Sequence, residues 1–110
     1  MNVEEIREYA ISKPDVEESF PFGPETLVFK IAGKVFLLMG LEHDPLQFNV
    51  KCDPERAIEL RDEFECIIPG YHMNKKHWNS VIVDGTLTSK KLKEQIDHSY
   101  DLVKPKAKRK

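Results

Sequence analysis

Apolar and polar residues alternate along three consecutive segments in the first half of the chain, residues 27–31, 34–41 and 46–51. Alternation with a period of two residues is typical of strands that are buried on one face. Ala32-Gly33 supplies a turn after the first segment, and His43-Asp44-Pro45 supplies a turn before the third. The pattern therefore predicts a three-stranded antiparallel meander with one buried face and one largely hydrated face.

The second face of this predicted sheet also carries apolar residues. Strict alternation assigns Val28, Phe36 and Leu38 to the face opposite Leu27 and Phe29. An apolar group on a hydrated face indicates either that the sheet is partly covered or that the face is a patch for self-association. The sequence leaves both interpretations open.

Helical periodicity predicts three helices. Asn2 is a capping residue for a first helix over about residues 2–12. Asp53-Pro54 combines an N-cap with proline at the first helical position, and this second helix continues to about residue 65. Thr88 caps the last helix. The inner stripe of that helix consists of Leu92, Ile96, Ser99, Tyr100 and Val103.

The remaining segments complete an α+β fold. Ile67-Ile68 and residues 78–83 are predicted strands, and residues 14–25 are predicted to be a loop with three prolines, in which residues 15–18 form at most one helical turn. The order is α-βββ-α-ββ-α, which predicts a two-layer domain with helices packed on one five-stranded antiparallel sheet. We expect a single domain over residues 1–103 and a basic, disordered tail over residues 104–110.

Charge is distributed unevenly along the chain. The formal net charge is −2, but residues 104–110 carry five bases and no acid, so the preceding residues carry −7. No acidic residue occurs from Cys66 to Val83, a stretch that contains Lys75 and Lys76. This composition excludes a uniformly basic coat protein for nucleic acid and leaves a local basic face as the alternative.

Targeting signals and disulfides are not expected. The chain has no apolar run near the ~18 residues that a membrane span needs, and its acidic, amphipathic N-terminal segment is not a secretory signal. Cys52 and Cys66 flank a predicted helix that would hold their backbones roughly 20 Å apart, too far for a disulfide. We therefore expect a cytoplasmic protein with free thiols and no membrane partner.

The histidines and cysteines do not form a catalytic or metal-binding motif. His72 and His77 are five residues apart, and no second pair of ligands lies at the short spacing typical of zinc sites. Cys52 begins a helix, where the helix dipole favours a thiolate, but Asp53 beside it opposes that effect. We expect no enzymatic activity, no cofactor and no metal.

The segment from Tyr71 to Asn79 has the residue types that bind nucleic acid. Lys75 and Lys76 neutralise phosphates, Asn74 and Asn79 hydrogen-bond to bases or phosphates, and the flat rings of Tyr71, His72 and Trp78 stack on unpaired bases. Lys91, at the start of the last helix, is unfavourably placed relative to the helix dipole, which hints at an anionic partner. A structural interpretation also remains open. In it Trp78 packs in the core, which its alternation with Ile82 favours over base stacking, His72 and His77 hold a tight connection, and the lysines are hydrated.

Six groups of residues resemble the signature of the MmcQ/YjbR family. They are Pro69-Gly70-Tyr71-His72-Met73-Asn74-Lys75-Lys76-His77-Trp78, Val81-Ile82-Val83-Asp84-Gly85, Pro21-Phe22-Gly23, Val28-Phe29-Lys30, Lys51-Cys52-Asp53-Pro54-Glu55 and Ser99-Tyr100. The resemblance implies an α+β fold similar to type III secretion chaperones and to the double-wing DNA-binding motif. Because members of this family are described as DNA-binding, it also implies a nucleic-acid partner. The residues expected to contact it are Tyr71, His72, Asn74, Lys75, Lys76, His77 and Lys91.

Two other functions stay open from the sequence. The likeness to secretion chaperones and the apolar second sheet face are also consistent with a protein-binding module or a homodimer. A small-molecule site near His72, His77 and Cys52 is the third interpretation. The sequence does not distinguish DNA from RNA.

Overall fold

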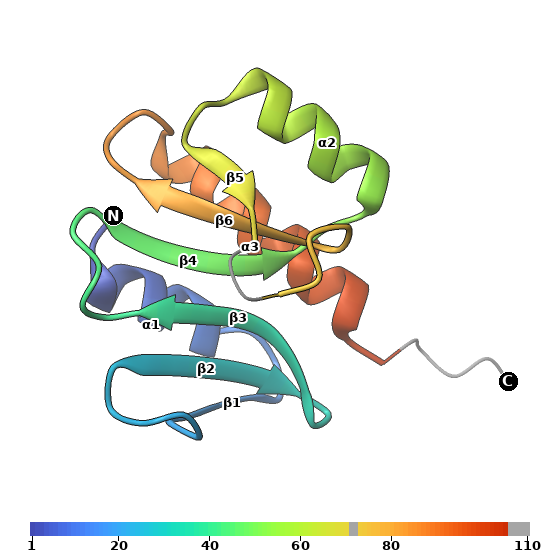
Figure 1. Cartoon of the computed structure of the whole chain (residues 1–110). Coiled ribbons are helices and arrows are strands. Elements are labelled where there is room, and N and C mark those ends of the chain that lie inside the picture. The colour runs from blue at the N-terminus through green and yellow to red at the C-terminus, as the bar shows by residue number, and fades with distance from the viewer. Residues whose placement is uncertain (71–72, 106–110) are drawn as a thin grey trace, which may run out of the picture.

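The computed structural model describes residues 1–70 and 73–105. These residues form three helices and one sheet of six strands, arranged as in Figure 1. The helices are α1 (Val3–Ile11), α2 (Pro54–Glu63) and α3 (Ser89–Val103). The strands are β1 (Val16–Ser19), β2 (Thr26–Ile31), β3 (Lys34–Gly40), β4 (Leu46–Lys51), β5 (Ile67–Pro69) and β6 (Trp78–Val83). The α+β class and the three helices agree with the prediction from the sequence.

The strands form one antiparallel sheet in the order β1-β2-β3-β4-β6-β5. Helices α1 and α3 lie on the same face of this sheet in Figure 1, and α3 packs across the two central strands, β3 and β4. α2 lies beside the edge strand β5. The domain therefore has a helix-covered face and a second, uncovered face.

The prediction of five strands was wrong, because residues 14–25 were assigned to a loop. Val16–Ser19 instead form β1, which pairs with β2 from Ile31 to Val28. This edge strand carries Glu17 and Glu18, and charged residues on edge strands hide the apolar alternation by which strands are identified. Glu18 makes an ion pair with Arg7 of α1, so its charge is used to attach the strand to a helix.

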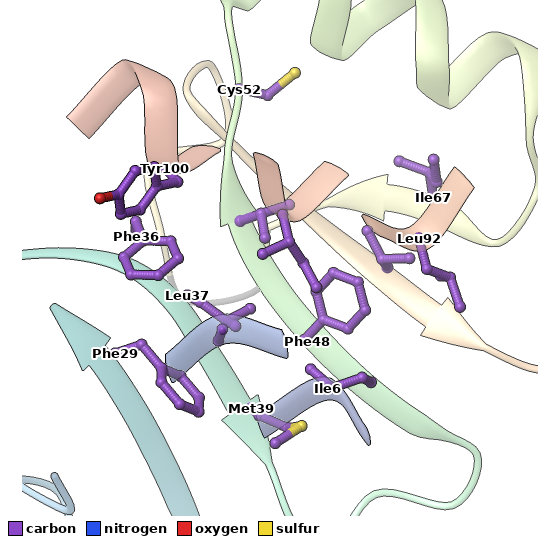
Figure 2. Packing of buried hydrophobic residues seen from close by; sticks show 14 of the residues in the cluster. Ile6, Phe29, Phe36, Leu37, Met39, Phe48, Cys52, Ile67, Leu92 and Tyr100 are labelled. Atoms are coloured by element: carbon purple, nitrogen blue, oxygen red, sulfur yellow. The ribbon is translucent and has the colours of Figure 1, made fainter. Parts of the chain in front are cut away.

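A β-bulge also corrects the placement of Phe36. Phe29 pairs with Leu37 and Lys30 pairs with Val35, so Phe36 is an extra residue in β3. Its side chain is fully buried and packs edge-on against Tyr100 of α3, with ring centroids 5.4 Å apart (Figure 2). Phe36 therefore belongs to the helix-covered face, not to the second face as alternation predicted.

The core lies between the sheet and the two helices that cover it. Phe29, Phe48 and Ile6 are completely buried there, together with Leu92 and Ile96 of α3 (Figure 2). The predicted inner stripe of the last helix is thus confirmed. Such side chains each contribute roughly 1.5–3 kcal/mol by leaving water, which makes this face the main source of stability.

The helix starts follow from local capping. The side chain of Asn2 accepts a hydrogen bond from the backbone N–H of Glu5, and the Glu5 carboxylate accepts one from the backbone N–H of Asn2. Asp53 caps α2 through the Arg56 N–H, and Thr88 caps α3 through the Lys91 N–H. Each cap satisfies a backbone donor that a helix leaves unpaired. All three predicted caps are confirmed.

Candidate functional site

Lys75 and Lys76 occupy the tip of a hydrogen-bonded turn. The N–H of His77 donates to the carbonyl of Asn74 at 3.1 Å, which closes the turn around the two lysines. The side-chain oxygen of Asn74 accepts the N–H of Lys76 at 2.9 Å. Both lysines are exposed, so the asparagine shapes the turn and the lysines carry its charge into solvent.

The turn is attached to two neighbouring elements. The carbonyl of His77 accepts the N–H of Cys52 at 2.7 Å, which joins the turn to the end of β4. From α2, the guanidinium of Arg61 donates to the carbonyl of Lys75 at 2.9 Å and to the carbonyl of Ala57 at 3.2 Å. These bonds fix the backbone of the turn while leaving the lysine ammonium groups outside it.

A pocket of about 390 Å³ lies beside this turn, at the end of the sheet where β3 and β6 begin and where β4 and α3 end. It is lined by Lys34, Val35, Lys51, Trp78, Leu102 and Val103; we call it the Trp78 pocket. Trp78 is half-buried and is absent from the core cluster and from the residues packed against it. The interpretation that Trp78 packs in the core was therefore wrong.

Ser99 of α3 holds this end of the sheet together. Its hydroxyl is completely buried, accepts the N–H of Lys51 at 2.9 Å and donates to the carbonyl of Phe36 at 2.5 Å. The bulge at Phe36 presents this carbonyl to the helix. One polar residue in an apolar helix stripe thus satisfies two buried backbone groups, which would otherwise each cost free energy.

Two lysines line the Trp78 pocket and two more are in the turn that precedes Trp78, and none of the four has an ion-pair partner within the described residues. Within residues 1–70 and 73–105, the ion pairs are Arg7–Glu18, Lys13–Asp97, Lys91–Glu94 and Lys104–Asp101. Lys34, Lys51, Lys75 and Lys76 take part in none of them, and no carboxylate lines the pocket. This end of the molecule therefore has a positive surface around an aromatic side chain.

The structure does not bring Lys91 to this surface. Lys91 makes an ion pair with Glu94 at 3.5 Å, and its ammonium group lies 5.9 Å from the centre of the Phe64 ring, just beyond the end of α2. Lys91 is in the first turn of α3, whereas Leu102 and Val103, which line the Trp78 pocket, are in its last turn. About 16 Å of helix therefore separates Lys91 from the pocket.

Tyr71 and His72, which were also predicted to be in the site, lie outside the described residues. Of the other predicted residues, Asn74, Lys75, Lys76 and His77 are together in the turn. Lys34 and Lys51 were not predicted, because they are far from the acid-free segment in the sequence. They are the first residue of one predicted strand and the last of the next, and in an antiparallel pair of neighbouring strands those two positions lie at the same end.

Cys52, Cys66 and His98 are in environments that do not favour reactivity. Burial raises the pKa of both the Cys52 and the Cys66 thiols, which disfavours the nucleophilic thiolate. Desolvation, assisted by the charge of Arg56, lowers the pKa of His98, whose Nε2 accepts the Asp53 N–H at 3.2 Å. Across the described part of the chain, no three His, Cys, Asp or Glu side chains are grouped to hold a metal ion.

A second pocket, of about 470 Å³, lies on the uncovered face of the sheet. Its polar lining comes from Thr26, His43, Gln47, Asn49 and Ser80, and its apolar lining from Leu38, Ile68 and Pro69. The hydroxyl of Ser80 donates to the side-chain oxygen of Asn49. Neither a lysine nor a carboxylate lines this pocket, so it differs from the Trp78 pocket in charge.

None of the helices within the described residues is long and apolar enough to cross a membrane.

Comparison with known proteins gives a consistent result. The chain is 40% identical over 100 residues to the uncharacterized protein YbdF of Escherichia coli, covering 91% of this chain and 82% of that protein. The crystal structure of protein DR2400 of Deinococcus radiodurans superposes with a TM-score of 0.88 at 42% identity, over 93% of this chain and 78% of that one. A Pseudomonas syringae crystal structure superposes with a TM-score of 0.81 at 30% identity, over 94% of this chain and 100% of that one. The YjbR family profile matches residues 11–102, so this chain belongs to the YjbR family.

Proposed function

We propose that this protein binds nucleic acid, and DNA in particular, without catalysing a reaction. The observation that carries the proposal is a set of four lysines without carboxylate partners in the described part of the chain: Lys34 and Lys51 line the Trp78 pocket, and Lys75 and Lys76 are in the turn that precedes Trp78. Phosphate contacts by lysine supply most of the non-specific affinity of proteins for nucleic acid. The buried thiols with raised pKa values agree with a role that is not catalytic.

The acidic charge of the rest of the molecule supports binding of nucleic acid at the lysine-bearing end alone. The net charge is −2 although this end is positive, so the remaining surface is acidic on balance. The outward side of α2, for example, presents Glu55, Glu59 and Asp62 to solvent. A polyanion would be repelled there and attracted only to the lysine-bearing end, which would orient the complex.

Charge reversal at the turn tests the proposal. Lys75→Glu combined with Lys76→Glu should weaken binding to a fluorescent DNA oligonucleotide by at least tenfold, because two phosphate contacts are replaced by repulsion. For the wild type, log K should fall with log salt at a slope of roughly −3, as expected for about four neutralised phosphates. Since both side chains are exposed, the thermal midpoint should change little.

Lys90→Glu combined with Lys91→Glu is the matched control. It makes the same change in net charge at the start of α3, away from the Trp78 pocket, where acidic residues suit the helix dipole. Binding should stay within about threefold of the wild type, since only long-range electrostatics change. Absence of binding by the wild type, or an equal loss in both double variants, would contradict the proposal.

The alternative of a protein-binding module loses one of its two supports. It depended on the likeness to secretion chaperones and on Val28, Phe36 and Leu38 forming an apolar patch on the second sheet face. Phe36 is in the core against Tyr100, and Val28 is completely buried, which leaves Leu38 half-buried in a pocket that neither a lysine nor a carboxylate lines. Phe36→Glu is therefore expected to unfold the protein, and it would not report on self-association.

A further inference from the structure

The shape and chemistry of the Trp78 pocket allow the ligand to be specified more closely. We infer that this pocket holds one unpaired base of a single-stranded nucleic acid, stacked on Trp78, so that the protein prefers single strands to duplexes. The inference rests on the proposed function, because the lysines around the pocket supply the attraction for the strand. The stacking itself depends on different atoms and is tested separately.

The walls of the pocket suit the flat, largely apolar face of a base. Trp78 is half-buried, which leaves part of its indole available to a ligand, and Leu102 is 45% exposed. Val35 and Val103 complete the apolar part of the lining. The volume of about 390 Å³ is within the range of small-ligand pockets. Stacking on an aromatic ring tolerates any base, because every base has a π-face.

The lysines are arranged around this ring at distances suited to neighbouring phosphates. Lys51 is the direct cross-strand partner of Trp78 in the sheet register, and such partners have Cβ atoms about 5 Å apart. Lys76 is two residues before Trp78, so their Cα atoms are at most about 7 Å apart. A base that enters the pocket would therefore have cationic groups nearby for the phosphates that flank it.

The position of Trp78 is fixed by the close approach of a glycine. The N–H of Gly70 donates to the carbonyl of Trp78 at 2.9 Å. A Cβ atom built on Gly70 would lie 2.8 Å from the Cβ of Trp78 and 3.1 Å from its carbonyl oxygen, closer than side chains are found. Glycine thus allows the two strands to meet at this point, and the tryptophan is held at the pocket before any ligand arrives.

Duplex DNA would not use the pocket equally well. Its bases are paired and stacked inside the helix, so placing one against Trp78 requires that it be flipped out, at a cost of unstacking and unpairing. A single strand presents its bases without that cost. The lysines would contact the phosphates of either form, which predicts weaker, salt-sensitive binding to duplexes and tighter binding to single strands.

Intrinsic fluorescence gives a direct test, because Trp78 is the only tryptophan of the chain. A thymidine 12-mer and a duplex of the same length are titrated into the wild-type protein at 50 mM salt. We expect the single strand to quench the tryptophan emission and to bind about tenfold more tightly than the duplex, the effect of stacking one base. The duplex should bind with little quenching.

Variants of Trp78 separate base stacking on the indole from the electrostatic attraction of phosphates by the lysines. Trp78→Leu should lose the preference for the single strand, measured by polarisation of a labelled 12-mer, whereas Trp78→Phe should retain most of it. Phe22→Leu is the control, since Phe22 is an exposed aromatic outside the pocket, and it should bind like the wild type. If Trp78→Leu fails to fold, the quenching and the Trp78→Phe affinity decide the question.

The two ways of failing differ. If neither nucleic acid binds, the proposed function is wrong and the inference falls with it. If both bind equally, with the salt dependence of phosphate contacts but unchanged tryptophan emission, the proposed function stands and the base-stacking role of Trp78 is overturned.

Discussion

Two pockets of this protein are similar in volume but differ in the charge of the side chains that line them. The Trp78 pocket, of about 390 Å³, is lined by two lysines and an aromatic ring, and the pocket on the uncovered sheet face, of about 470 Å³, by neutral side chains. The first is at the ends of strands and the second largely in their middles. The comparison shows that the charge of the side chains that line a pocket, more than its volume, decides which ligands it attracts.

The neutral pocket satisfies much of its own polarity. Ser80 donates a hydrogen bond to Asn49 on the neighbouring strand, with which it is in register. The imidazole of His43 lies against Gly40, where a Cβ atom would come within 2.4 Å of the ring. In the middle of a sheet, cross-strand neighbours are close enough to pair in this way. Lysines at strand ends have fewer such neighbours, so their charge stays available.

Charge reversal in the Trp78 pocket should give the largest difference between the two regions. Lys34→Glu combined with Lys51→Glu is expected to weaken binding of single-stranded DNA by about 100-fold, because two contacts become repulsive next to the bound base. Gln47→Glu combined with Thr26→Glu places two acids in the neutral pocket and should weaken binding by less than about threefold. Polarisation of a labelled oligonucleotide measures both. Equal losses would show that the two pockets do not differ as proposed.

Removal of the buried Ser99 hydroxyl, which holds the end of the sheet at the Trp78 pocket, is expected to give the next largest effect, a loss of folding stability. Ser99→Ala removes a buried hydroxyl and leaves the Lys51 N–H and the Phe36 carbonyl unpaired, which should lower the free energy of unfolding by about 2 kcal/mol. Urea denaturation measures this change. Ser89→Ala is a suitable control because Ser89 is an exposed residue in the first turn of α3; its effect should be within about 0.5 kcal/mol. A stability loss below that limit for Ser99→Ala would remove the assigned role of the hydroxyl.

The smallest expected effect is the loss of thermal stability in acid that comes from protonation of His98. His98 accepts the Asp53 N–H, and its pKa is lowered, first by desolvation and then by Arg56. The unfolded chain, in which His98 titrates near 6.5, therefore binds a proton more readily than the folded protein. The stability from neutral His98 is present above that pH and is lost as the pH falls through the lower folded value. Thermal midpoints measured from pH 7.5 to 5 should fall less steeply in His98→Gln than in the wild type; equal slopes would contradict this.

The sequence by itself determined the elements that depend on local interactions. Asn2, Asp53 and Thr88 fixed the starts of the three helices, because a cap bonds to backbone groups only two or three residues away. Alternation identified the three strands of the meander. These features need no information from distant parts of the chain.

Only the tertiary structure decided which residues from distant segments of the chain are neighbours. The bulge that turns Phe36 into the core, the pairing of the acidic edge strand β1 and the separation of Lys91 from the Trp78 pocket all depend on contacts between distant segments. Lys34, Lys51 and Trp78 meet because antiparallel strands bring the beginning of one to the end of the next. Sheet register sets these neighbours, and one inserted residue changes which face a side chain occupies. The residues that bear the charge could thus be recognised from the sequence, whereas the pocket they surround is a product of strand pairing.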